Sequence, residues 1–431
     1  SHFGSRAPKA TTRSRPHRRR ASLSPSMAQR VIIIGGGNSG IITAQEVVKQ
    51  KGASVTIIQA EEFNEWYIAS PYCLTRPETH SKHVGSMDKS KIKGVTYEFG
   101  VVTQLNPEDV VLKSGKSVPF DVLVLAVGFS MPIIKPALGQ SWQERSLEVQ
   151  AYGKAIKAAK TVVVVGSGPV GVEMVCDVKE VAPKDCRVVL VSRGAVLSGS
   201  SEKIQQKAEG VLKQQGVEVV QGELAGEAVA SATRTTVNLK DGNSLEADVV
   251  LPCFTSGFQT GFLASVQGLT DERGRVVVNE FLQCAAQPKI FAVGCANLNE
   301  FSGIAKIEPQ AKTVAANVKC ALAGKPPAKK HKEGNSFMKA PPLQIMGHDT
   351  WAFMDPANLP PPVACCARIG FPCCPLPCCW CCCPPCCCGG PCQDPESRGL
   401  ASFMTHTATP KLMNMRMHKG AGELAPAQMQ M

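Results

Sequence analysis

Residues 31–40 read VIIIGGGNSG, a run of β-branched apolar residues that leads directly into a cluster of glycines. A second stretch, VVVVGSGPVG at residues 162–171, repeats this design. A continuous β-branched run predicts a buried strand of a parallel sheet, and the glycines after it predict a tight turn into a helix. Two such units in one chain predict an α/β protein with two Rossmann-like, dinucleotide-binding domains, flanked by disordered tails.

The glycines of each turn have separate tasks. In the first turn, Gly35 permits the sharp bend, Gly37 lets the backbone approach a pyrophosphate, and Gly40 lets the following helix pack on the strand. The start of that helix, at Asn38 and Ser39, offers free N–H groups to the phosphates. The second turn predicts the same roles for Gly166, Gly168, Pro169, Val170 and Gly171.

The charge of the chain is unevenly distributed. The 431 residues carry a formal net charge of +12, and residues 1–26 hold seven Lys and Arg residues and no acid. The remainder is only mildly basic and has few aromatic residues, so nucleic-acid binding through a folded basic face is not expected. The Arg- and Ser-rich composition of 1–26 is typical of an organelle transit peptide. Met27 also offers a natural start, which would make 1–26 non-native upstream sequence.

Changes of pattern divide the chain into parts. These are the leader (1–26), the first dinucleotide-binding domain (28–140), the second one (141–254), the remainder of the first (255–323), a linker with a remnant C-terminal region (324–364), and a Cys/Pro-rich and Met-rich low-complexity tail (365–431). Finer patterns predict short antiparallel strands over 94–120, two strands over 274–301, a helix that begins near Glu308, and ordered strand over 342–355.

Further motifs accompany the two turns. LAVG at residues 125–128 closes the first unit, and IFAVG at 290–294 precedes a helix. Together with FNEWYIASPYCLTRPE at 63–78 and GPVGVEMVCDVKE at 168–180, they resemble the FAD/NAD(P)-dependent pyridine nucleotide oxidoreductases, in the apoptosis-inducing-factor-like, ferroptosis-suppressor branch. The sequence is also similar to type II NADH dehydrogenases.

This resemblance implies an activity. The first domain would hold FAD and the second would hold NADPH or NADH. Electrons would pass from the nicotinamide through the flavin to a quinone or another small acceptor. A disulfide reductase would need a cysteine pair near the flavin, whereas the first unit has only Cys73, which is expected to be a packing thiol.

The first site departs from the family pattern at three places. Gln59 stands where an acid would bind the ribose, although Glu61 or Glu62 could substitute for it. The family's Ala-Thr-Gly turn is Ala126-Val127-Gly128, so that Val127 and Gly128 are its cofactor-facing residues. The family's Gly-Asp, which contacts the ribityl–phosphate region, is Gly294-Cys295, with the acid deleted between them, while Asn297 and Glu308 still fit. Loss of this acid predicts weaker FAD binding.

The second site has its own diagnostic residues. Ser192 and Arg193 end the second strand, where an acid would select NAD. They would instead accept a 2′-phosphate, unless Arg193 is simply a solvated surface residue. Glu173 matches the family's catalytic acid near the nicotinamide–flavin junction. A carboxylate that compensates the helix dipole is the alternative interpretation of Glu173.

Residues 365–392 hold thirteen of the twenty cysteines, interrupted by prolines. S-acylation there would give peripheral membrane association, in the cytoplasm, beside a lipid-soluble quinone. Soft-metal binding and a misread frame are the alternatives, and no metal site with recurrent spacing is evident. A mitochondrion or plastid is the alternative location if the leader is a transit peptide.

The sequence therefore predicts an FAD-dependent NAD(P)H oxidoreductase. The alternatives are a degenerate flavoprotein fold that binds NAD(P) without turnover, and a thiol-rich metal-binding or interaction protein.

Overall fold

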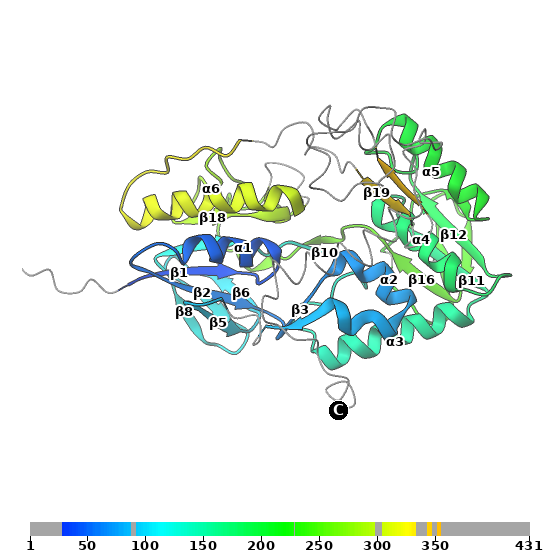
Figure 1. The fold of residues 1–431 in the computed structure, drawn as a ribbon, viewed down its shortest axis with the longest axis horizontal. Helices are drawn as coiled ribbons and strands as arrows, with labels where there is room; N and C mark the ends of the chain where they lie inside the picture. Colours follow the sequence, from blue (N-terminus) through cyan, green and yellow to red (C-terminus); the bar gives the residue numbers. More distant parts are fainter. Residues whose placement is uncertain are drawn as a thin grey trace, which may run out of the picture.

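The computed structural model describes residues 28–87, 92–227, 229–297, 304–332, 343–346 and 351–354. The leader and the cysteine tract lie outside these residues. The described chain forms two α/β bodies, each built on a parallel sheet, which confirms the predicted fold class (Figure 1).

The first body contains a five-stranded parallel sheet in the order β18-β9-β1-β2-β5. Its strands are β1 (Gln29–Ile34), β2 (Ala53–Gln59), β5 (Val95–Phe99), β9 (Val122–Leu125) and β18 (Ile290–Ala292). Alternate residues of β1 face opposite layers. Val31 and Ile33 pack toward α1 (Asn38–Val47) and α6 (Ile304–Leu322), whereas Ile32 and Ile34 pack toward the antiparallel strands β6 (Val102–Leu105), β7 (Asp109–Leu112) and β8 (Ser117–Pro119).

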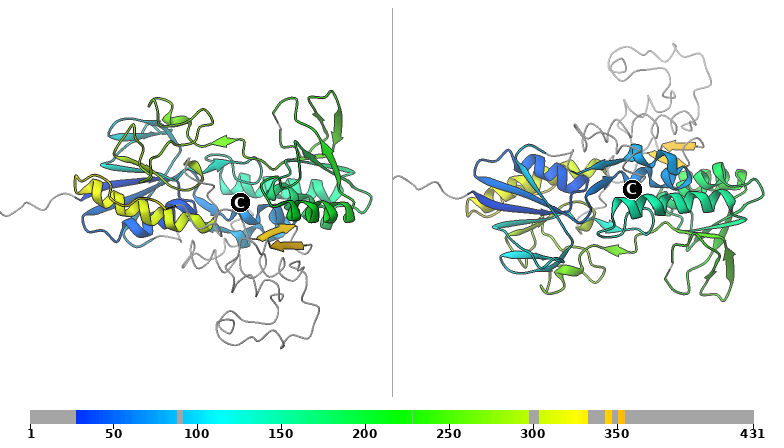
Figure 2. Two further views of the ribbon diagram at one scale, coloured as in Figure 1. Left: turned by 90° about the horizontal axis from the view of Figure 1, so that it is seen from above. Right: turned by 90° about the horizontal axis from the view of Figure 1, so that it is seen from below.

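The second body contains a four-stranded parallel sheet in the order β13-β12-β11-β16. Seen from above and from below, it lies beside the first body (Figure 2). Its strands are β11 (Thr161–Val165), β12 (Arg187–Ser192), β13 (Glu218–Gln221) and β16 (Val249–Pro252). Val162 and Val164 pack toward helices α3 (Trp142–Ala158), α4 (Pro169–Val181) and α5 (Glu202–Gln214). Val163 and Val165 face the hairpin of β14 (Thr235–Asn238) and β15 (Ser244–Ala247).

The bodies are joined at several places. Short strands β10 (Phe129–Ser130) and β17 (Gly257–Phe258) pair antiparallel where the chain passes between them (Figure 1). Residues 63–86 also belong to the junction, because α2 (Ser70–Thr75) packs against both α3 and α4. The other elements of this segment are β3 (Phe63–Glu65), η1 (Tyr67–Ala69), η2 (Pro77–His83) and β4 (Val84–Ser86).

Two strand predictions were wrong in part. The first strand of 94–120, β5, pairs parallel with β2 as the edge of the main sheet, and only β6 to β8 are antiparallel. Of the two strands expected over 274–301, β18 is the strand that the described residues form, and Val276 makes only isolated bridges. Alternation of apolar residues marks an extended segment but does not identify its partner.

Two helices also differ from the predictions, one in its start and one in its existence. Helix α6 begins at Ile304 rather than near Glu308 and contains Pro309, although proline more often marks a helix start. Helix α3 was missed, although Ser141 and Glu144 form a capping box in which the Ser141 Oγ accepts from the Glu144 N–H at 3.2 Å and the Ser141 N–H donates to Glu144 Oε2 at 2.9 Å.

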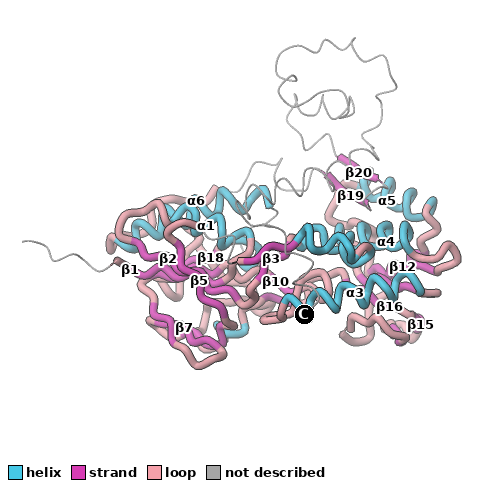
Figure 3. Tube along the Cα trace, turned by 60° about the horizontal axis from the view of Figure 1, so that its bottom comes forward, coloured by secondary structure: helices cyan, strands magenta, loops and turns pink. Residues whose placement is uncertain are grey.

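Residues 325–332, which follow α6 and were predicted to be part of a linker, are held in place by hydrogen bonds. The Asn317 amide oxygen accepts from the N–H groups of Ala328 and Lys329, at 3.1 and 2.9 Å, and fastens residues 325–332 along α6. The strands expected over 342–355 are confirmed as an antiparallel pair, β19 (Leu343–Met346) and β20 (Trp351–Met354). Strand β19 of this pair lies beside α4 (Figure 3).

Candidate functional site

The first glycine of each turn adopts a conformation that excludes a side chain. Gly35 has φ +104° and Gly166 has φ +106°. A Cβ atom on Gly35 would lie 2.4 Å from the carbonyl oxygen of Ala126, and one on Gly166 would lie 3.0 Å from that of Cys253. Each turn is thus wedged against the end of a neighbouring strand, and glycine is required for both reasons.

The last glycine of each turn permits close packing of helix on strand. A Cβ atom on Gly40 would lie 1.8 Å from the Gly35 oxygen, and one on Gly171 would lie 1.7 Å from the Gly166 oxygen. No real side chain fits at such distances. The predicted packing roles of Gly40 and Gly171 agree with this geometry.

The middle glycine of each turn faces open space instead. Gly37 and Gly168 are the N-caps of α1 and α4, with extended backbone, and a Cβ atom on either would meet no atom within 4 Å. No side chain caps either helix, so N–H groups of the first turns are available in front of the glycines. The space and the donors fit a pyrophosphate in both places.

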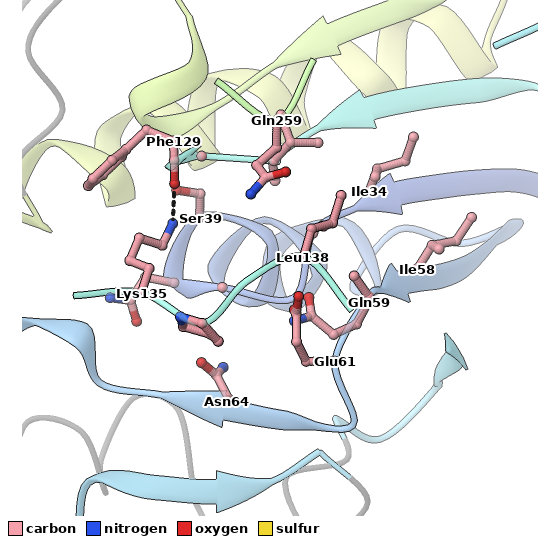
Figure 4. A pocket seen from close by; sticks show the side chains of 18 of the residues that line it. Ile34, Ser39, Ile58, Gln59, Glu61, Asn64, Phe129, Lys135, Leu138 and Gln259 are labelled. Carbon is pink, nitrogen blue, oxygen red and sulfur yellow. Dashed lines mark hydrogen bonds between the residues drawn. The ribbon is translucent and has the colours of Figure 1, made fainter. Parts of the chain in front are cut away.

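A cavity extends from the first turn along the carboxyl ends of the strands (Figure 4). Eight of the predicted site residues line it, namely Gly35, Gly37, Asn38, Ser39, Gln59, Val127, Gly128 and Cys295. Gly40, Gly294 and Asn297 lie directly behind this wall and are buried. The structure therefore brings together residues from four separate segments that the sequence places up to 260 positions apart.

Gln59 and Glu61 form one end of the cavity. Gln59 Oε1 accepts from the Gly36 N–H, and its Nε2 donates to Glu61 Oε2 at 2.6 Å. Glu61 Oε1 accepts from the Gly139 N–H at 3.0 Å, and burial raises the pKa of Glu61. Of the two acids considered as substitutes, Glu61 is the one that lines the cavity, while Gln59 braces the turn.

Residues 294–297 form the opposite wall. Gly294 has φ +85°, and a Cβ atom there would lie 2.2 Å from Ser39 Oγ. The Gly294 N–H and Asn297 Nδ2 donate to Gln310 Oε1, at 2.8 and 3.0 Å, so that α6 fixes this turn. Cys295 presents a thiol to the cavity, and burial raises its pKa. A neutral thiol thus occupies the wall where the family pattern has a carboxylate.

Lys135 was not predicted from the sequence. Its Nζ donates to the Phe129 carbonyl at 2.7 Å and lies 4.5 and 5.1 Å from the ring centroids of Phe129 and Tyr67. Burial lowers the pKa of Lys135 and raises that of Tyr67. All three residues line the cavity, where the ammonium group can donate to an anionic or carbonyl ligand (Figure 4). No motif around Lys135 signals this role.

A buried ion pair supports the cavity from β3. Arg145 Nε and Nη2 donate to the two oxygens of Glu65 at 2.9 and 2.8 Å. Although burial opposes ionisation, Arg145 holds the pKa of Glu65 well below its usual range. Glu148 accepts a further bond from Arg145 at 2.8 Å. Helix α3 is thereby fixed to the cavity wall.

At the second turn, Ser192 and Arg193 differ in accessibility. Ser192 is 1% exposed, and its hydroxyl donates to the Gly194 carbonyl at 2.6 Å and also bonds the Ser167 hydroxyl. Arg193 is exposed. Pro169 begins α4 and is exposed, whereas Val170 packs against the apolar core of the second body.

Glu173 lies one turn into α4, and the first turn of this helix contains no acid. Compensation of the helix dipole therefore does not explain it. Burial and the nearby Asp177 raise the pKa of Glu173 well above its usual range. Glu173 does not belong to the described residues that line the first cavity. Its catalytic role stays a prediction.

The described cysteines form no disulfide bond with one another. Cys73 is buried, and burial raises its pKa, as expected for a packing residue. Within the described ranges, no group of His, Cys, Asp and Glu residues is arranged to hold a metal ion. The cysteine tract of 365–392 lies outside these ranges.

Comparison with known proteins agrees with this geometry. The profile of the pyridine nucleotide-disulphide oxidoreductase family matches residues 29–318. FAD-dependent oxidoreductase FVFD30 of Flammulina velutipes is 29% identical over 230 residues, which cover 52% of this chain and 70% of the relative. Ferroptosis suppressor protein 1 of Xenopus laevis is 26% identical over 330 residues, which cover 71% and 84%.

The fold has solved counterparts. The sulfide:quinone oxidoreductase of Aquifex aeolicus superposes with a TM-score of 0.67 at 16% identity, over 93% of this chain and 94% of that one. The resemblance to the ferroptosis-suppressor branch is confirmed by these relatives. Because the family profile spans more than half of the sequence, the chain belongs to the pyridine nucleotide-disulphide oxidoreductase family.

Proposed function

We propose that the protein is an FAD-dependent NAD(P)H oxidoreductase that passes electrons to a quinone. The observation that carries this proposal is the repeated turn, since Gly37 and Gly168 both leave open space in front of an uncapped helix start. One site fits the pyrophosphate of FAD and the other that of the nicotinamide nucleotide. The overall reaction is NAD(P)H + H⁺ + quinone → NAD(P)⁺ + hydroquinone.

The residues of the first cavity fit FAD. The N–H groups at Asn38 and Ser39 would bind its pyrophosphate, and Glu61 would accept from a ribose hydroxyl. Lys135 would supply positive charge beside the ring system, between the aromatic side chains of Tyr67 and Phe129. Bound FAD supplies the hydride and electron chemistry, whereas these residues bind and orient it.

The cysteines bear on the identity of the electron acceptor. A disulfide acceptor within the enzyme requires two thiols near the flavin, and Cys73 is buried and unpaired in the described chain. We therefore expect electrons to pass directly from the flavin to a small acceptor. A quinone is supported by the name of the structural relative, a sulfide:quinone oxidoreductase.

We further propose that NADPH is used at least as well as NADH. Ser192 and Arg193 replace the acid that would repel a 2′-phosphate, and the Arg193 guanidinium is exposed. A charge-assisted bond of this kind contributes about 1.5–3 kcal/mol, or roughly a ten- to hundredfold preference when fully formed. Arg193→Glu should shift the preference toward NADH. An unchanged NADPH/NADH ratio of kcat/KM in this variant would remove Arg193 from the site.

Association with a membrane is proposed through acylation of the cysteine tract, which would place the enzyme at the cytoplasmic face of a membrane, near a lipid-soluble quinone. If the leader is a transit peptide, the location would be a mitochondrion or plastid. Within the described residues, no helix is long and apolar enough to cross a membrane.

The decisive experiment is the absorption spectrum of the protein expressed from Met27. We expect non-covalent FAD and oxidation of NAD(P)H by a water-soluble quinone. A folded, colourless protein that cannot be reconstituted with FAD would contradict the proposal. It would favour a degenerate NAD(P)-binding protein, which the thiol of Cys295 in place of an acid also supports.

A further inference from the structure

The loop after β12 is fastened to the second glycine turn at two points. The Ser192 hydroxyl at the end of β12 bonds the Ser167 hydroxyl within the turn. The Leu197 N–H donates to the Ser167 carbonyl at 2.9 Å. Ser167 therefore holds both ends of the loop, with its side chain at one end and its main chain at the other.

The hydrogen bonds of Ser192 leave its hydroxyl no proton to donate to a phosphate. Its one proton goes to the Gly194 carbonyl at 2.6 Å, so the Ser167 hydroxyl is the donor between the two serines. The side chain is also buried, with the residue 1% exposed. Ser192 can thus act on a nucleotide only by fixing the backbone on either side of Arg193.

The far end of the loop is equally constrained. Leu197 has φ +53°, a left-handed conformation that is unfavourable for a residue with a Cβ atom. It is held there by its bond to Ser167 and by its side chain, which is 1% exposed and packs in the core of the second body. The loop therefore has one defined path past the glycine turn.

Arg193 is the charged residue that this path presents. It is exposed, and it contributes, after Lys240, to lowering the pKa of Glu223, two residues beyond the end of β13. A long side chain in solvent has many rotamers, so its contact with a ligand depends on where its backbone is held.

We infer that Ser167 and Ser192 form a positioning tether that aims Arg193 at the 2′-phosphate of NADPH. Neither serine is a ligand, and both act through the loop. The inference rests on the proposed preference for NADPH, and it assigns to Ser192 a positioning role instead of the phosphate contact expected from the sequence.

Binding of fragments tests the tether apart from activity. The probes are 2′,5′-ADP and 5′-AMP, titrated calorimetrically into the FAD-saturated full chain, and the measured quantity is the ratio of their dissociation constants. Arg193→Ala should reduce the preference for 2′,5′-ADP at least tenfold. Ser192→Ala should reduce it about three- to tenfold, the size of one hydrogen bond. In the Arg193→Ala background, Ser192→Ala should have no further effect.

Three further serine variants test whether the effect is specific to the tether. Ser167→Thr retains the hydroxyl and should retain the preference, whereas Ser167→Ala should behave as Ser192→Ala does. Ser231 is the matched control, because its hydroxyl also donates to a backbone carbonyl, that of Thr233 at 2.8 Å, in the same body. Ser231→Ala should leave the ratio unchanged.

The outcomes separate the two claims. If Arg193→Ala changes the ratio and Ser192→Ala does not, the tether is wrong while the NADPH proposal stands. Equal effects of Ser192→Ala with and without Arg193 would also overturn the tether. If Arg193→Ala itself changes nothing, the NADPH proposal fails and the tether fails with it.

Discussion

Gly37→Ala should weaken FAD binding at least tenfold without unfolding the protein. Gly37 has φ −72° and ψ −174°, which alanine adopts readily, and its Cβ atom would meet no protein atom within 4 Å. That atom would instead occupy the space in front of the helix start. The substitution therefore separates the requirement of the ligand from that of the fold.

The expected magnitudes differ for stability and for binding. Alanine at an N-cap costs about 0.5–1 kcal/mol relative to glycine, and reduced freedom of the unfolded chain offsets about 0.4–1 kcal/mol of it, so stability should change little. Displacing a phosphate from one or two N–H donors forfeits about 1.5–3 kcal/mol for each bond. FAD affinity should fall at least tenfold and up to roughly 10⁴-fold.

The assay combines FAD titration by fluorescence with thermal melting of the FAD-free protein. Gly168→Ala is the matched control, since its Cβ atom also meets no atom within 4 Å. This variant should weaken the binding of NADPH and leave the binding of FAD unchanged. Gly40→Ala should instead destabilise the fold, because its Cβ atom would lie 1.8 Å from the Gly35 oxygen. Normal FAD affinity in Gly37→Ala would refute the placement of the pyrophosphate at this turn.

Cys295→Asp should tighten FAD binding several-fold, because it restores a carboxylate acceptor to the cavity wall; equal dissociation constants in a fluorescence titration would mean that the site has already compensated. Glu173→Gln should slow reduction of bound FAD by NAD(P)H in stopped-flow measurements while leaving FAD content unchanged, and an unaltered rate would exclude Glu173 from the reaction. Arg145→Leu should cost about 3–5 kcal/mol of unfolding free energy at pH 7, since it removes the guanidinium that pairs with buried Glu65 and leaves only the Ser70 hydroxyl and the His80 imidazole beside it. Arg145 lowers the folded-state pKa of Glu65, so the stabilisation by this ion pair is complete above the pKa of Glu65 in the unfolded chain and is lost as pH falls. The unfolding free energies of variant and wild type, measured by urea melts, should therefore converge in acid. A difference that stays constant with pH would show that packing, not charge, is responsible. Truncation after Leu359 should move the protein from the membrane to the soluble fraction of a eukaryotic cell, as hydroxylamine treatment should, and identical fractionation of both forms would rule out acylation as the anchor.

The two dinucleotide turns were readable from the sequence because their constraints are local. A sharp bend at Gly35, an open N-cap at Gly37 and close helix packing at Gly40 all arise within one strand–turn–helix unit. The positive φ of Gly35 and the contact of Gly40 with the Gly35 oxygen both arise within six residues. The same holds for the second turn, and a capping box as local as Ser141 and Glu144 could also have been read in advance.

The tertiary structure alone decided which distant residues complete these turns. Lys135 has no motif, and its place beside Tyr67 and Phe129 depends on a chain crossing between the two bodies. The sequence also suggested Ser192 as a phosphate ligand, but its partner in the structure is Ser167, 25 positions away. Hydrogen-bond partners and burial depend on the order of the parallel strands in the sheet, and this order cannot be inferred from the spacing of residues in the sequence.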